Sequence, residues 1–187
     1  MTPLPRKVAV IGAGDIGCGW AALCAAAGWP VAIFDANAQG LERAAAEVPR
    51  RARAMVALER ATQGMVERGL LELQLGRSLL QAVQDADWVI EAISEELIGK
   101  QKLFGALEQV AAPQALLTSS SSGLPPTELF ARCRHQDRCL VAHPLNPPDR
   151  NTCAPSAGCR SSSRRPSRGT WSDASPPPCG GSLSTSC

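Results

Sequence analysis

Short apolar runs alternate with longer amphipathic stretches over the first 148 residues of the chain. Runs of four or five apolar residues predict buried strands, and longer periodic stretches predict helices. We expect strands at Lys7–Ile11, Val31–Phe34, Glu72–Leu75, Trp88–Ile93, Leu116–Ser119 and Cys139–His143. We expect helices at Asp15–Ala27, in two pieces across Ala38–Gly69, and at Leu79–Gln84, Lys100–Val110 and Pro125–Arg132. Strand and helix in turn predict an α/β domain with a doubly wound, mostly parallel sheet.

This pattern stops near Pro148. Residues 149–187 contain ten Ser, five Arg, five Pro, four Gly and four Cys, and no Val, Ile, Met, Phe or Tyr. Such a segment buries too little apolar surface to offset its ordering entropy. We therefore predict one domain at 1–148 and a disordered tail at 149–187. Out-of-frame GC-rich DNA tends to encode this composition, so we favour a frame-shifted end over an ordinary flexible tail.

Charge and length restrict the class of protein. The chain has 187 residues and a net charge of +2, which predicts a single α/β domain with no field directed at nucleic acid or an anionic membrane. No apolar run approaches the roughly 18 residues of a membrane span, and no secretory signal precedes the first strand. The four cysteines before residue 149 lack metal-ligand spacing. We expect a cytoplasmic protein without metal, nucleic-acid partner or membrane.

The first chemical motif is a glycine-rich turn that follows the first predicted strand and opens the first predicted helix. This position is what a G-x-G-x-x-G dinucleotide site requires, and it predicts a Rossmann-like domain. The first glycine permits the tight turn, the second admits the cofactor pyrophosphate, and the third lets helix and strand pack closely. The helix N-terminus attracts the phosphates. The predicted cofactor-binding residues are Gly12, Ala13, Gly14, Asp15, Ile16 and Gly17.

A carboxylate stands where the adenosine ribose of a dinucleotide is recognised. Asp35 ends the second predicted strand, 18 residues after Gly17. At this position a carboxylate accepts hydrogen bonds from the ribose hydroxyls and repels a 2′-phosphate. Ala36 and Asn37 follow, with no Arg to accommodate such a phosphate. The sequence therefore favours NAD over NADP; FAD is the main alternative ligand.

Three further motifs make a family resemblance specific. They are Asp85–Leu97 with Lys100 after it, Thr118–Leu124 (TSSSSGL) and His143–Pro148 (HPLNPP). Together with the glycine turn, they resemble the NAD-binding domain of the 3-hydroxyacyl-CoA dehydrogenase family over residues 6 to 148. The last two are most similar to the lambda-crystallin branch, which includes L-gulonate 3-dehydrogenase and is related to carnitine dehydrogenases.

The resemblance implies a reaction and a role for each matched residue. A 3-hydroxyacyl-CoA or small 3-hydroxy acid would be oxidised by hydride transfer to NAD. His143 would be the general base, with Ser122 and Asn146 holding the substrate oxygen and the nicotinamide ribose. Glu95 and Lys100 would contact the cofactor. Without the resemblance, His143 is an ordinary loop residue, the serines are a polar loop or helix cap, and the two charges belong to the surface.

The chain departs from the family after Pro148. The family's histidine is oriented by a glutamate on a further strand, and the matching position here is Pro155. The resemblance implies a helical domain that closes over substrate and forms the homodimer, and we expect no counterpart of it in these 187 residues. Because such an orienting partner matters greatly to rate, we expect weak NAD binding and little turnover from this chain. A non-catalytic NAD-binding or crystallin-like structural protein, or the inactive product of a disrupted gene, are the alternatives.

Overall fold

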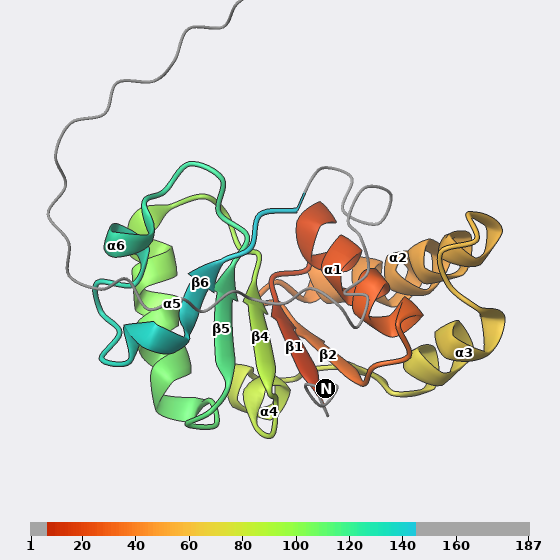
Figure 1. Ribbon diagram of the computed structural model, residues 1–187, viewed down its shortest axis with the longest axis horizontal. Coiled ribbons are helices and arrows are strands. Elements are labelled where there is room, and N and C mark those ends of the chain that lie inside the picture. Colours follow the sequence, from red (N-terminus) through yellow and green to blue (C-terminus); the bar gives the residue numbers. More distant parts are fainter. Residues whose placement is uncertain (1–6, 145–187) are drawn as a thin grey trace, which may run out of the picture. The chain divides into compact units, whose positions relative to one another are not determined.

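The computed structural model describes residues 7–144, so the expectations for residues 145–187 lie outside the described range. Six parallel strands form one sheet in the order β3-β2-β1-β4-β5-β6, and Figure 1 shows β6, β5, β4, β1 and β2 side by side. The strands are β1 (Val8–Ile11), β2 (Val31–Phe34), β3 (Leu73–Leu75), β4 (Trp88–Glu91), β5 (Leu116–Ser119) and β6 (Cys139–Val141). The predicted doubly wound parallel sheet is confirmed, and its strand order changes direction between β1 and β4.

The helices differ from the prediction mainly at their ends. They are α1 (Asp15–Ala26), α2 (Ala38–Ala57), α3 (Gln63–Leu71), α4 (Leu79–Val83), α5 (Leu97–Val110) and α6 (Pro126–Leu129), with a 3₁₀ turn at Gln136–Arg138. The two expected helices across 38–69 are confirmed. Helix α6 is shorter than predicted because i→i+3 bonds, such as Cys133 N–H to the Phe130 carbonyl (2.9 Å), turn the chain after Phe130.

Side-chain alternation along the central strands creates two cores. Val8 and Val10 face a cluster formed with α1, α2 and α3, while Ala9 and Ile11 face a second cluster formed with α4, α5 and α6. All four residues of β1 are buried, which is the condition of a strand covered on both faces. Within residues 7–144, no helix combines the length and the apolarity needed to cross a membrane.

The sheet determines where functional groups can gather. Because all strand pairs are parallel, their carboxyl ends meet at a single edge. The connections that leave this edge are the segments that follow each of the six strands. In open α/β sheets, ligands bind in the crevice outside the carboxyl ends, at the point where the strand order reverses.

Candidate functional site

The glycine turn after β1 has the geometry that its three glycines predict. Gly12 has φ of +107°, and a Cβ on it would lie 2.5 Å from the Ala92 carbonyl oxygen of the turn after β4. A Cβ on Gly17 would lie 1.8 Å from the Gly12 carbonyl oxygen, so side chains are excluded at both positions. A Cβ on Gly14 would meet nothing within 4 Å. Gly14 therefore leaves open space beside the backbone, at the place where a pyrophosphate is expected.

The start of α1 is available to an anion. Among the described residues, no side chain caps this helix at Gly14, so its first N–H groups, which carry the partial positive charge of the helix, have no side-chain acceptor at the cap. Ile16 is half-buried and packs against the core on this helix. Asp15 is exposed, and its Oδ1 lies 2.6 Å from Nη2 of Arg51 on α2. The Arg51 guanidinium thus offsets a negative charge that would otherwise oppose a phosphate here.

Asp35 closes the glycine turn from the end of β2. Its Oδ2 accepts a hydrogen bond from the Ala13 N–H (2.7 Å), and its Oδ1 accepts one from the Asn37 N–H (2.8 Å). Gly40 lies against this carboxylate, since a Cβ there would be 3.3 Å from Oδ2. The carboxylate therefore lies beside the turn, in the position from which ribose hydroxyls are recognised.

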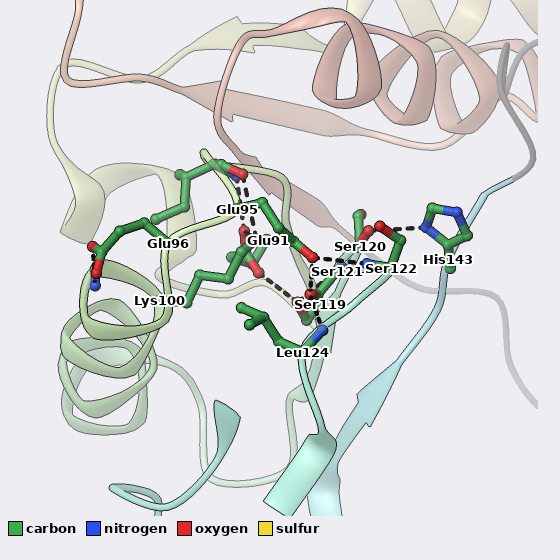
Figure 2. Close-up of polar contacts among 12 residues, drawn as sticks. Glu91, Glu95, Glu96, Lys100, Ser119, Ser120, Ser121, Ser122, Leu124 and His143 are labelled. Atoms are coloured by element: carbon green, nitrogen blue, oxygen red, sulfur yellow. Dashed lines mark hydrogen bonds and ion pairs between the residues drawn. The ribbon is translucent and has the colours of Figure 1, made fainter. Parts of the chain in front are cut away.

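The side chain of Glu95 accepts several hydrogen bonds from the loop that follows β5 (Figure 2). Its Oε1 accepts hydrogen bonds from the Ser121 hydroxyl and from the N–H groups of Ser122 (3.0 Å) and Gly123 (3.1 Å). Partial burial on its own would raise the pKa of Glu95, but the bonds from Ser121, Gly123, Ser122 and Lys100 outweigh it and lower the pKa to about 2. The side chain is ionised near neutral pH and ties the turn after β4 to the serine loop.

A buried ion pair lies behind Glu95. Lys100 and Glu91 are 1% and 0% exposed, and Nζ of Lys100 is 2.5 Å from Oε1 of Glu91. The same nitrogen lies 3.3 Å from Oε2 of Glu95 and 3.3 Å from the Ile93 carbonyl. The ammonium group thus has three protein oxygens around it, and its predicted contact with the cofactor stays a prediction.

Glu91 belongs to this site although no sequence motif predicts a role for it. Its Oε2 accepts a 2.5 Å hydrogen bond from the Ser119 hydroxyl, which in turn accepts one from the Ser121 N–H (3.1 Å). Its backbone carbonyl accepts the Ser120 N–H (2.9 Å). A charged residue at the end of an otherwise apolar strand, nine residues before a lysine, was the available signal.

His143 follows β6 and is exposed. Its Nδ1 lies 3.1 Å from the carbonyl oxygen of Ser120, beyond the end of β5, and Figure 2 shows the imidazole facing the serine loop. Ser122 is an exposed member of that loop, and its N–H is bound to Glu95. Asn146 lies outside the described residues. The structure thus brings His143, Ser122 and Glu95 to one edge of the sheet, together with the glycine turn and Asp35.

A parallel sheet in this strand order, with a glycine turn and a carboxylate after its first two strands, defines a dinucleotide-binding domain of the dehydrogenase type. The chain belongs to the 3-hydroxyacyl-CoA dehydrogenase NAD-binding domain family, which residues 7–152 match. The domain predicted at 1–148 overlaps this match, although its end stays a prediction. NAD is therefore the cofactor of this family's domain.

Proteins of known sequence agree with the branch indicated by the motifs. The lambda-crystallin homolog of Bos taurus is 40% identical over 155 residues, which are 77% of this chain and 45% of that protein. The L-carnitine dehydrogenase of Pseudomonas aeruginosa is 40% identical over 143 residues, 76% of this chain and 43% of that enzyme. The chain thus spans less than half the length of these relatives.

Solved structures show the same architecture. The 3-hydroxybutyryl-CoA dehydrogenase of Escherichia coli matches with a TM-score of 0.70 and 35% identity, covering 78% of this chain and 30% of that one. An NAD⁺-dependent dehydrogenase of 5-formyl-3-hydroxy-2-methylpyridine-4-carboxylic acid matches with a TM-score of 0.71 and 28% identity, covering 78% and 46%. The share of this chain that aligns is close to the share that the structure describes.

Proposed function

We propose that this chain supplies the cofactor-binding and proton-transfer half of an NAD-dependent dehydrogenase. Its substrate is a 3-hydroxyacyl-CoA or a small 3-hydroxy acid, whose 3-hydroxyl is oxidised. The observation that supports this proposal most directly is that His143 lies at the same edge of the sheet as the glycine turn. Its Nδ1 is 3.1 Å from the carbonyl oxygen of Ser120. A CoA thioester substrate would place the reaction in fatty acid metabolism. The cytoplasm is the proposed location.

The residues present fit a bound NAD. Gly14 leaves room for the pyrophosphate, and the uncapped start of α1 faces it. The Asp35 carboxylate would accept the ribose hydroxyls and disfavour the 2′-phosphate of NADP. Bound NAD supplies the hydride acceptor. The remaining proposed contacts with the cofactor are those of Glu95, Lys100 and Ser122, and of Asn146, which lies outside the described residues.

The proton step falls to His143. A neutral imidazole has a ring nitrogen with a free lone pair, which is why histidine is the side chain that most often serves as a general base. The Ser122 hydroxyl, on a loop held by Glu95, would hold the substrate oxygen while the proton leaves. Asn146 would share this task or hold the nicotinamide ribose. The carboxylate of Glu95 already accepts hydrogen bonds from the serine loop, so His143 is the base assigned to this step.

Binding of NAD can be tested with two glycine variants that separate cofactor contact from folding. Gly14→Ala adds a methyl group that meets no protein atom within 4 Å, at a φ of −73°, so the fold should persist. The methyl group occupies the pyrophosphate space, and we expect NAD affinity to fall by at least about tenfold, or about 1.4 kcal/mol, in calorimetric titration. Gly64→Ala, equally open but remote from the turn, is the matched control.

Two outcomes would contradict this proposal. One is wild-type chain that is folded but shows no NAD affinity. The other is equal NAD affinity in Gly14→Ala and wild type. Gly17→Ala serves as the opposite reference, because its Cβ would lie 1.8 Å from the Gly12 carbonyl oxygen and should destabilise the whole turn. Its loss of binding should therefore be accompanied by a lower melting temperature.

A second candidate is a binder of NAD without turnover. The name of the bovine relative, a lambda-crystallin homolog, favours it. Both candidates predict NAD binding, so steady-state assays with 3-hydroxyacyl-CoA, L-gulonate and L-carnitine distinguish them. The chain spans 45% and 43% of the length of these two relatives. The proposal therefore also includes what the resemblance implies for the whole protein, which is a small-molecule substrate, a helical domain and a homodimer.

A further inference from the structure

The imidazole of His143 is in contact with an atom that can only accept a hydrogen bond. Its Nδ1 lies 3.1 Å from the main-chain carbonyl oxygen of Ser120. A carbonyl oxygen has lone pairs and no proton, so Nδ1 must donate in this contact. A neutral imidazole carries a single N–H. The proton therefore lies on Nδ1, and Nε2 is left with the free lone pair.

We propose that the Ser120 carbonyl is the group that orients His143 and fixes its tautomer. This inference rests on the proposed role of His143 as base. In the family that role is expected of a carboxylate, and the matching position is Pro155, which lies outside the described residues and has no acceptor side chain. A partner on one imidazole nitrogen determines which nitrogen remains basic. Nε2 is thus the atom that would receive the substrate proton.

Ser120 is itself held from two neighbouring elements. Its N–H donates to the Glu91 carbonyl at the end of β4 (2.9 Å). Its hydroxyl accepts a hydrogen bond from Nε1 of Trp20 on α1 (2.9 Å). Trp20 is buried and Ser120 is half-buried, so this contact is partly buried. Trp20 is therefore a positioning residue that acts on the imidazole through Ser120.

A carbonyl and a carboxylate do not provide the same assistance. Both hold the ring and select the Nδ1–H tautomer. Only a carboxylate adds a full negative charge that stabilises the imidazolium formed when the base takes a proton. The proposal therefore predicts that His143 is held in one orientation and one tautomer, but that its protonated form is not stabilised by a neighbouring negative charge. A histidine without any partner would lack both the fixed tautomer and the charge stabilisation.

The tautomer can be measured directly, because the chain has two histidines, His143 and His135. Long-range ¹H–¹⁵N spectra at about pH 9, where imidazoles are neutral, distinguish Nδ1–H from Nε2–H. His135→Gln leaves a single imidazole and so assigns the signals. We expect His143 to be mainly Nδ1–H, whereas exposed His135 should show the Nε2–H preference of free histidine. A His143 that is mainly Nε2–H would overturn the proposal.

The role of Trp20 has its own test. Trp20→Phe removes the indole N–H, and we expect the Nε2–H fraction of His143 to rise toward that of free histidine. Trp29→Phe is the matched control, since Trp29 is buried in the same cluster and packs edge-on against Trp88. Ser120→Ala keeps the carbonyl but loses the hydroxyl, so it should also raise the Nε2–H fraction of His143, and it replaces Trp20→Phe as the test if Trp20→Phe does not fold. Unchanged tautomers in both variants would refute the role of Trp20.

These results are separable from the proposed function. NAD titration of the same wild-type sample reports on the cofactor site, which the tautomer measurement does not involve. A chain that binds NAD but has His143 as Nε2–H would overturn only the orienting role of Ser120. A chain with the Nδ1–H tautomer and no NAD affinity would overturn only the proposed function.

Discussion

At the scale of single residues, the feature with the largest cost in desolvation is the buried ion pair of Glu91 and Lys100. Two ions with 0% and 1% exposure have lost their hydration, and only mutual attraction and further hydrogen bonds offset that loss. Here every oxygen of the Glu91 carboxylate has a partner, since Ile93 N–H also donates to Oε1 (2.8 Å). Such a pair contributes little net stability when complete but costs much when broken.

Lys100→Met should therefore be strongly destabilising. The methionine fills most of the space but leaves the Glu91 carboxylate buried without a counter-charge, so we expect a loss of about 3–5 kcal/mol in the free energy of unfolding. Urea unfolding at neutral pH measures it. Lys102→Met, on the exposed side of the same helix, is the control and should change stability by less than about 0.5 kcal/mol. A similar small change in both variants would contradict the buried-pair argument.

At the scale of elements, the position of Lys100 depends on where helix α5 begins. Glu96 caps α5 by accepting hydrogen bonds from Ile98 N–H (2.9 Å) and Gly99 N–H (2.6 Å). The helix therefore begins at Leu97, three residues before the predicted start, and this first turn carries Lys100 into the core. Glutamate is not among the usual capping residues, which is why the sequence pattern did not reveal the cap.

The link between the turn after β4 and the serine loop should be sensitive to acid. The pKa of Glu95 is lowered from 4.5 to about 2 in the folded chain, so its stabilisation is complete above about pH 5 and is lost as the pH falls toward 2. Urea midpoints for wild type should therefore approach those of Glu95→Gln between about pH 5 and pH 3. The difference is modest because the side chain is 42% exposed.

The control for this prediction is Glu72→Gln, which removes an exposed carboxylate at the end of α3, away from the serine loop. Its urea midpoint should run parallel to that of wild type over the same pH range. If the Glu95→Gln and wild-type midpoints differ by the same amount at every pH, the hydrogen bonds to Glu95 do not lower its pKa in solution.

At the scale of the whole domain, the two cores share their strands. Neighbouring residues of β1, such as Val8 and Ala9, belong to opposite cores, so neither core can open while the other keeps the strand in place. Unfolding of the described domain should therefore be a single cooperative transition, as for most domains of this size.

NAD should stabilise the folded domain as a whole and so raise the temperature of this single transition. At a concentration of one hundred times its Kd, a ligand that binds only the folded chain adds about 2.7 kcal/mol. Scanning calorimetry should show one peak that moves to higher temperature with NAD, with equal calorimetric and van't Hoff enthalpies. At the same NAD concentration, Gly14→Ala should gain at most about 1.4 kcal/mol if its affinity is at least tenfold lower, so its peak should move less than that of wild type. Two peaks, or a shift in only one of them, would show that the cores unfold independently.

Much of this architecture could be predicted because the information is local. Alternation of apolar runs and helical stretches predicts the six strands, and the glycine spacing predicts the open space at Gly14. The contact of Trp20 with Ser120 could not be predicted, because it joins residues 100 positions apart. The pairing of Glu91 with Lys100 depends likewise on where a helix starts. The predictions for Asn146, Pro155 and the tail concern residues outside the described range.

The three aromatic side chains on one face of the sheet have an optical consequence. Trp20 and Trp88 have ring centroids 5.7 Å apart at 76°, and Trp29 and Trp88 are 6.3 Å apart at 66°. Because these indoles are close together and strongly inclined, we expect their strong far-ultraviolet transitions to couple and to give an exciton signal in the far-ultraviolet circular dichroism. Because Trp20 also touches Ser120, the chain contains a chromophore whose signal changes when the loop beside the imidazole moves.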